Sequence, residues 1–260
     1  MTMADEFKSS RGLSVSHGGK GEPLVVLLHG LGANRLVWQR MIGMADKHWP
    51  GRWIAPDLRG HGRSLCEGPY GYAMHAADIA ELIRDEPGGN VTLAGHSFGG
   101  VVAAMTGTGW FGPRVKDIAA FGVKIVWTAE EEAKAHELAQ RPTRIFATRA
   151  EAVDRFLKSS GLFGLVDPAS DAAASGITGS EGDWRVAMDP RCYGAVGPAL
   201  DKLLRLTASP LRLAAGENDP MVSLDQMRAI DPAARTFAGA AHNAHWETPE
   251  LVWDFIACRK

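Results

Sequence analysis

The pentapeptide Gly95-His96-Ser97-Phe98-Gly99 places a serine where its hydroxyl could act as a nucleophile. An apolar run at residues 91–94 predicts a buried strand before it, and the apolar residues 101–105 predict a buried helix after it. A sharp turn between the two is crowded, and the flanking glycines, which lack a Cβ atom, permit it. The helix N-terminus favours the negative charge of an oxyanion. A glycine-rich turn that binds phosphate, or that only packs, is the alternative.

A base and an acid that could serve this serine follow later in the chain. Gly216-Glu-Asn-Asp219 comes directly after the apolar residues 210–215, which predict a strand, and Gly239-Ala-Ala-His242 follows another predicted strand at residues 234–237. Ligands of a parallel sheet bind beyond the carboxyl ends of its strands. We therefore expect Ser97, Asp219 and His242 to meet on three loops at one edge of a sheet.

Each of these assignments has a rival in the sequence. His245 stands three residues after His242, and Glu217 and Asp225 compete with Asp219 for the role of the acid. His242 and His245 together with Glu247 could also form a metal cluster. An HExxH helix is absent and no third ligand stands at a typical spacing, so we expect no metal.

The remaining elements alternate between strands and helices. Continuous apolar character predicts central strands at residues 23–28, 53–57 and 115–126, and residues 6–18 predict an edge hairpin. Helical spacing of apolar residues predicts helices over 34–45, 72–84, 223–230 and from 249 onward. Such alternation indicates an α/β protein with a doubly wound, mostly parallel sheet.

Residues 127–198 interrupt this alternation. Thr128-Ala-Glu-Glu131 and Thr148-Arg-Ala-Glu151 have the form of capping boxes, each opening an amphipathic helix. We expect an all-helical cap over the carboxyl edge of the sheet, inserted into a core made of residues 1–126 and 199–260. A lid over an apolar cleft needs apolar side chains on both faces, so Trp127 and Trp184, which lie near the ends of the insert, are expected to face the substrate.

Composition narrows the class of protein. The chain has 260 residues, a hydrophobic fraction of 45% and a net charge of −2, which is ordinary for a globular protein and gives no electrostatic case for nucleic acid or an anionic membrane. The polar N-terminus does not resemble a signal peptide, and no apolar run has the length of a membrane span. Three widely spaced cysteines favour reduced thiols. We expect a cytoplasmic protein.

Five stretches together resemble the α/β-hydrolase superfamily. They are His29-Gly30, the segment from Asp57 to Ser64, the Ser97 pentapeptide, the Asp219 segment, and the His242 stretch with Glu247-x-Pro249 behind it. The likeness covers nearly the whole chain except the predicted cap. It implies the serine, acid, histidine chain order of the family's catalytic triad, here Ser97, Asp219 and His242.

The resemblance also implies an oxyanion hole. Its donors would be the backbone N–H groups of Phe98 and Leu31, and the adjacent Gly30 would contact the substrate. His29, and the loop of Asp57, Arg59 and His61, are expected to support these segments.

The sequence therefore predicts a cofactor-independent serine hydrolase. Its substrate would be a small, largely apolar molecule with an ester or related acyl bond, cleaved through an acyl-serine intermediate. The same triad would serve hydrolysis of a carbon–carbon bond, a lactone or an amide. A hydrolase-like protein that only binds a ligand is the alternative of a different class.

Overall fold

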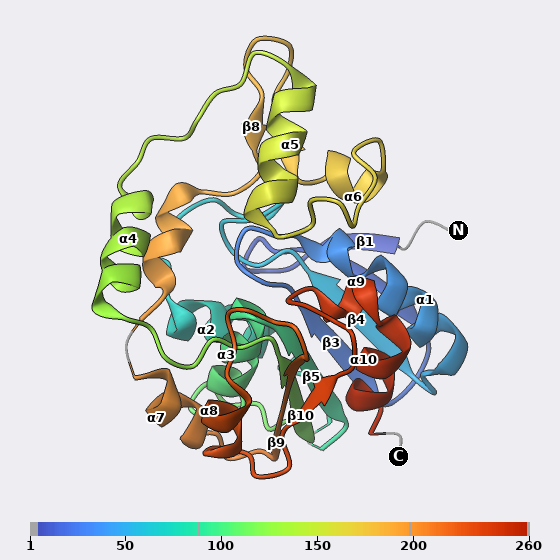
Figure 1. The fold of residues 1–260 in the computed structure, drawn as a ribbon. Coiled ribbons are helices and arrows are strands. Elements are labelled where there is room, and N and C mark those ends of the chain that lie inside the picture. Colours follow the sequence, from blue (N-terminus) through green and yellow to red (C-terminus); the bar gives the residue numbers. More distant parts are fainter. Residues whose placement is uncertain (1–4, 88, 198, 259–260) are drawn as a thin grey trace.

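The computed structural model describes residues 5–87, 89–197 and 199–258. Within these ranges the main sheet has eight strands in the order β1-β2-β4-β3-β5-β6-β9-β10, parallel except for the N-terminal hairpin of β1 and β2 (Figure 1). The strands are β1 (Asp5–Lys8), β2 (Ser14–Gly19), β3 (Leu24–Leu28), β4 (Arg52–Pro56), β5 (Val91–His96), β6 (Asp117–Phe121), β9 (Leu211–Gly216) and β10 (Arg235–Phe237). The α/β prediction with a mostly parallel sheet is confirmed.

Helices cover both faces of this sheet (Figure 1). Strand β3 shows why: all five of its residues are buried, with Val25 and Leu27 in one apolar cluster and the alternate residues in the other. One face carries α1 (Gln39–His48), α9 (Ala244–Glu247) and α10 (Pro249–Ile256). The other carries α2 (Tyr72–Leu82), α3 (Phe98–Thr106), α7 (Leu200–Arg205) and α8 (Leu224–Arg228).

The insert after β6 lies above the sheet in Figure 1. It contains α4 (Ala129–Ala139), α5 (Arg149–Ser159), α6 (Asp171–Ala174), two short strands β7 (Ile177–Thr178) and β8 (Arg185–Val186), and the 3-10 helix η2 (Pro190–Ala195). Both predicted capping boxes are present, at Thr128 with Glu131 and at Thr148 with Glu151. Pro198, the predicted last residue of the insert, lies outside the described residues.

Three details differ from the sequence-based expectation. The insert is not all-helical, because β7 and β8 pair antiparallel; two-residue strands are too short to leave a periodic pattern. Strand β6 ends at Phe121, because Gly122 turns the chain with a φ of 65°. The predicted helix 34–45 divides into η1 (Arg35–Trp38), capped by the Asn34 side chain, and α1. In the described residues, none of the helices combines the length and the apolar character that crossing a membrane requires.

Candidate active site

Ser97 occupies a strained turn between β5 and α3. Its φ of 51° and ψ of −117° lie outside the regions that residues with a side chain prefer, which costs on the order of 1–3 kcal/mol. The Ser97 N–H donates to the Phe121 carbonyl at 2.8 Å and so ties the turn to β6. A Cβ on Gly95 would lie 2.4 Å from the Gly99 oxygen, and one on Gly99 would lie 2.2 Å from the Leu28 oxygen. The two glycines are therefore required where the strand, turn and helix approach each other.

His242 and Asp219 form a hydrogen-bonded pair after β10 and β9. His242 Nδ1 lies 2.8 Å from Asp219 Oδ2, and the Asp219 side chain is fully buried. Because an ionised carboxylate only accepts, Nδ1 carries the proton and Nε2 is left with a free lone pair. The second oxygen of Asp219 accepts the Met221 N–H at 2.9 Å, which fixes the carboxylate.

Gly216 allows the two loops to meet. A Cβ at this position would lie 2.0 Å from the Ala241 carbonyl oxygen, immediately before His242.

The rival residues have other positions. His245 is buried in α9 with its ring 5.0 Å from that of Trp38, and burial lowers its pKa to about 3. Asp225 is exposed on α8.

Two other carboxylates hold the loop that carries His242. Glu217 accepts the Gly239 N–H at 2.9 Å, and Glu247 accepts the Ala241 N–H at 2.6 Å. The three candidate metal ligands therefore have separate contacts: His242 with Asp219, Glu247 with the Ala241 N–H, and His245 with the Trp38 ring.

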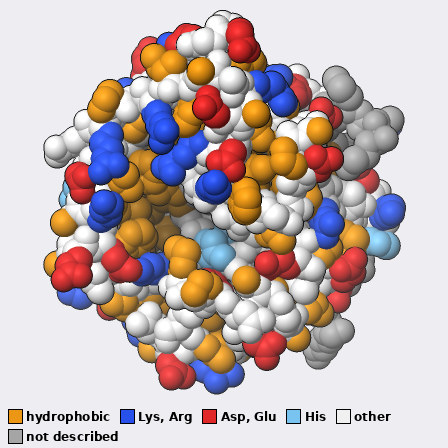
Figure 2. Space-filling view, turned by 45° about the horizontal axis from the view of Figure 1, so that its top comes forward, with side chains coloured by type: hydrophobic (Ala, Val, Ile, Leu, Met, Phe, Trp, Pro, Cys, Tyr) orange, Lys and Arg blue, Asp and Glu red, His pale blue; other side chains and the backbone are white. Residues whose placement is uncertain are grey.

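Ser97 and His242 line one cavity of about 300 Å³ between the sheet and the insert. Gly30, Leu31 and Phe98 line it as well. Phe98 is the first residue of α3, so its N–H has no acceptor within the helix. Figure 2 shows the hollow, with apolar side chains on its walls, a histidine at its edge, and Lys and Arg side chains gathered along one side.

Of the two tryptophans expected to face the substrate, one lines the cavity and the other does not. Trp127 lines the cavity, and its indole N–H donates to the Lys124 carbonyl at 3.2 Å. Trp184 is outside the cavity lining and the expectation for it is corrected: its backbone pairs with Phe146 through N–H···O contacts of 2.8 and 3.1 Å. This pairing directs the Trp184 ring onto the apolar cluster that α1 and α5 share.

Comparison with known proteins identifies the family of this chain. Residues 25–255 match the alpha/beta hydrolase family. This chain belongs to the α/β-hydrolase family. The thioesterase domain from the curacin biosynthetic pathway superposes with a TM-score of 0.78 at 20% identity, over 99% of this chain and 100% of that domain.

Two curated relatives show how far the likeness extends in sequence. Lipase LipV of Mycobacterium tuberculosis is 36% identical over 88 residues, which is 34% of this chain and 32% of the lipase. The magnesium-chelatase 30 kDa subunit of Rhodobacter capsulatus is 28% identical over 238 residues, 86% of this chain and 81% of that subunit. This α/β hydrolase thus spans about a third of the lipase and most of the chelatase subunit.

Two buried histidines support the loop that follows β3 in this α/β hydrolase. His29 Nε2 accepts the Leu58 N–H at 2.9 Å, and His61 Nε2 accepts the Gly32 N–H at 3.2 Å. Burial lowers the pKa of His29 to about 4 and that of His61 to about 3, so both rings stay neutral acceptors at neutral pH. They connect the Gly30–Leu31 segment to the loop after β4.

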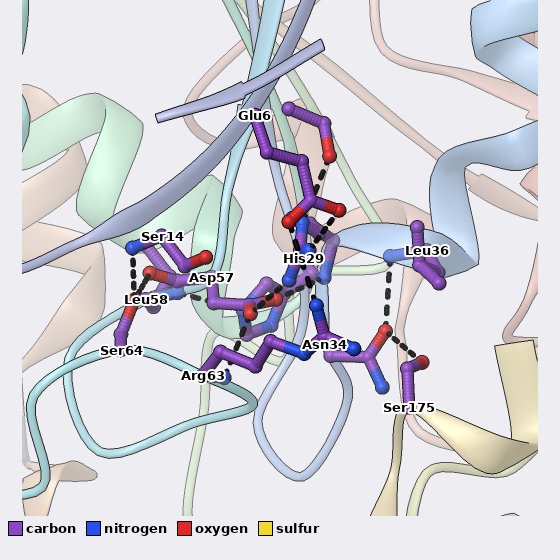
Figure 3. Close-up of polar contacts among 12 residues, drawn as sticks. Glu6, Ser14, His29, Asn34, Leu36, Asp57, Leu58, Arg63, Ser64 and Ser175 are labelled. Carbon is purple, nitrogen blue, oxygen red and sulfur yellow. Dashed lines mark hydrogen bonds and ion pairs between the residues drawn. The ribbon is translucent and has the colours of Figure 1, made fainter. Parts of the chain in front are cut away.

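Asp57 organises the same region (Figure 3). Its carboxylate accepts the N–H groups of Arg35 at 2.7 Å and Arg63 at 2.9 Å and pairs with the buried Arg35 guanidinium. Ser64 Oγ donates to the Asp57 carbonyl at 2.6 Å. A fully buried carboxylate with this many donors fixes the loop that the sequence analysis assigned a supporting role.

Asn34 connects the insert to the same region, because the Ser175 hydroxyl donates to the Asn34 side chain at 3.1 Å (Figure 3).

The cavity is also lined by four residues that were not predicted from the sequence: His96, Lys124, Lys158 and Tyr193. The only signal for His96 was its place directly before Ser97 in the pentapeptide. The other three lie in β6–α4, α5 and η2, where no motif marks them. Only the folded chain brings these segments together.

Proposed function

We propose that the protein is a serine hydrolase that cleaves an ester or related acyl bond of a small, largely apolar molecule. One observation carries this proposal: a serine on a strained turn shares a cavity with a histidine whose Nδ1 lies 2.8 Å from a buried carboxylate. Acyl transfer through a serine uses these three groups as nucleophile, general base and compensating carboxylate.

In the acylation step, Ser97 Oγ attacks the acyl carbon while His242 Nε2 takes the hydroxyl proton. The imidazolium that forms is stabilised by Asp219, which stays ionised. The C–O bond to the alcohol then breaks, and His242 returns the proton to the leaving oxygen. The products are the free alcohol and an acyl ester on Ser97.

In the deacylation step, a water molecule replaces the alcohol. His242 takes a proton from this water as its oxygen attacks the acyl carbon, and returns it to Ser97 Oγ as the acid leaves. In both steps negative charge develops on the acyl oxygen. The N–H groups of Phe98 and Leu31 are the proposed donors, and each is worth on the order of 3 kcal/mol in the transition state. The proposed reaction uses no metal or cofactor.

Relatives named as a lipase and as a thioesterase domain favour acyl-bond hydrolysis over the other reactions that this triad could perform. The alternatives are hydrolysis of a carbon–carbon bond, a lactone or an amide. A protein that only binds a ligand is the second alternative. One relative is named as a subunit of magnesium chelatase, and membership of the family does not by itself establish that a protein is catalytic.

The test is the intact mass of the protein after exposure to a fluorophosphonate. We expect one adduct on the wild type and none on Ser97→Ala, because only an activated serine reacts. Turnover of p-nitrophenyl esters of increasing chain length then defines the acyl group. A folded wild type that forms no adduct would contradict the proposal and favour the ligand-binding alternative.

A further inference from the structure

A second cavity adjoins the first within the insert. It measures about 240 Å³ and shares Ser159 and Tyr193 with the cavity that holds Ser97. Three arginines line it, Arg141 and Arg144 from the segment after α4 and Arg155 from α5. The apolar residues Leu138, Phe146, Val186 and Met188 form other parts of its wall.

The Lys and Arg side chains are the charged groups that line the two cavities. Lys124 and Lys158 line the first, in addition to the three arginines of the second. In the part of the chain that the structure describes, no Asp or Glu lines either cavity. The whole chain carries a net charge of −2, so this concentration of cations is not a reflection of composition.

Two of the five cations have no carboxylate partner. Lys124, Lys158 and Arg141 pair with Glu131, Asp154 and Glu137. Arg144 lies over the Phe146 ring at 4.8 Å, and no ion pair to Arg144 or Arg155 occurs among the described residues.

The Tyr193 side chain borders both cavities. Burial raises the pKa of its hydroxyl, and the nearby charge of Arg155 acts in the opposite direction. The hydroxyl is thus a neutral donor near an unpaired guanidinium.

Arg144 and Arg155 are exposed and lack an ion-pair partner among the described residues, so their guanidinium groups beside the cavity are available to bind an oxyanion. Arginine presents several N–H donors in a plane and binds carboxylate or phosphate oxygens through two parallel hydrogen bonds. We propose that the second cavity binds an anionic group, a carboxylate or a phosphate, at the end of the substrate's acyl chain. The proposal rests on the proposed function, since the scissile bond is placed at Ser97, and it defines the substrate class as an apolar chain that ends in an oxyanion.

The test compares four p-nitrophenyl esters built on one octanoyl chain, whose far end carries a methyl, carboxylate, phosphonate or trimethylammonium group. We expect kcat/KM for at least one anionic ester to exceed that of the methyl ester by about tenfold, as charge-assisted hydrogen bonds allow. The trimethylammonium ester should be the poorest substrate. The better of the two anions identifies carboxylate or phosphate as the natural group.

Arginine variants connect the preference to the cavity. In the double variant Arg144→Gln/Arg155→Gln the ratio of anionic to methyl kcat/KM should fall about tenfold, and Arg144→Lys/Arg155→Lys should retain part of it. Arg84→Gln is the matched control, because Arg84 is an exposed arginine outside both cavities and should leave the ratio unchanged. Equal kcat/KM for the anionic and methyl esters, or a ratio unaffected in the double glutamine variant, would overturn the inference.

A binding measurement separates this inference from the proposed function. Calorimetric titration with octanoate needs no turnover and should show tighter binding to the wild type than octan-1-ol, which has the same chain length and no anionic group, with the difference lost in the double glutamine variant. Without that difference the inference fails even if Ser97 reacts with the fluorophosphonate. If the difference is observed, the binding of an anionic group is supported even when the wild type forms no fluorophosphonate adduct and the proposed function fails.

Discussion

His96 Nε2 lies 2.9 Å from the carbonyl oxygen of His242. Because a carbonyl only accepts, Nε2 carries the proton and donates. Burial is the largest cause that lowers the pKa of His96 well below its usual value, so the ring is neutral at neutral pH. His96, the residue directly before Ser97, therefore holds the backbone of His242, the proposed base, and connects β5 to the loop after β10.

His96→Ala should reduce kcat more than it raises KM. Loss of a hydrogen bond worth about 1 kcal/mol lets the His242 loop move away from Ser97, for an expected loss of about fivefold. The rate of fluorophosphonate labelling at Ser97 should fall by a similar factor while circular dichroism shows a folded protein. His96→Asn, which keeps an N–H donor, should recover part of the rate. An alanine variant with wild-type kcat would show that the contact does not position the base.

Asp219→Asn should lower kcat by a factor on the order of 10⁴. With its oxygen on the Met221 N–H, the amide turns its NH2 group toward His242 Nδ1, which favours the other tautomer, and the neutral amide does not compensate the imidazolium. Glu217→Gln is the matched control in the same loop. The amide oxygen of the substituted side chain can still accept the Gly239 N–H that Glu217 accepts at 2.9 Å, so kcat should stay within about tenfold of wild type. Steady-state kinetics on one ester decides the assignment, and equal losses in the two variants would contradict Asp219 as the acid.

Trp127→Ala and Trp184→Ala should have different effects. Trp127 lines the cavity, so its truncation should raise KM and alter the preference for acyl chain length. Trp184 packs on the apolar cluster outside the cavity, so its truncation should lower Tm and leave the chain-length preference unchanged. An ester series and a thermal melt on both variants test this pair. A shifted chain-length profile in the Trp184 variant would contradict the placement.

The buried histidines predict that stability falls as the pH drops below about 6.5. Burial lowers the pKa of His29 to about 4 and of His61 and His245 to about 3, from an ordinary value of 6.5. At a pH between the folded-state pKa of each histidine and 6.5, the unfolded chain binds a proton that the folded protein excludes. The stabilisation is therefore complete above pH 6.5 and is lost as the pH falls, by up to about 1.4 kcal/mol per pH unit for each group.

His245→Phe isolates one contribution. Neither ring nitrogen of His245 has a hydrogen-bond partner among the described residues, and the ring packs against Trp38. An apolar ring should therefore flatten the dependence of the unfolding free energy on pH between 4 and 6 by up to about 1.4 kcal/mol per unit. Urea unfolding at a series of pH values measures the slope, and an unchanged slope would refute the protonation of His245 as a cause.

Much of the fold was predictable from local patterns. The apolar run of β3, the two threonine capping boxes and the pair of glycines around Ser97 express constraints that act within a few residues, such as burial on both faces, unsatisfied N–H groups and crowded turns. Ser97, Asp219 and His242 each follow a predicted strand. Because the carboxyl ends of parallel strands lie at the same edge of a sheet, the sequence predicted that the three residues lie at one edge.

Tertiary structure decided what local patterns left open. His242 and His245 have the same chemistry three residues apart, and only packing directs one to Asp219 and buries the other against Trp38. Trp184 was misplaced because its partner, Phe146, is distant in sequence. The cations of the two cavities belong to no motif that marks a binding site. By itself, the sequence determined most of the strands, the turn at Ser97 and the chain order of the proposed triad. The partner of each histidine and the charged lining of the two cavities were decided by long-range contacts, which local periodicity does not encode.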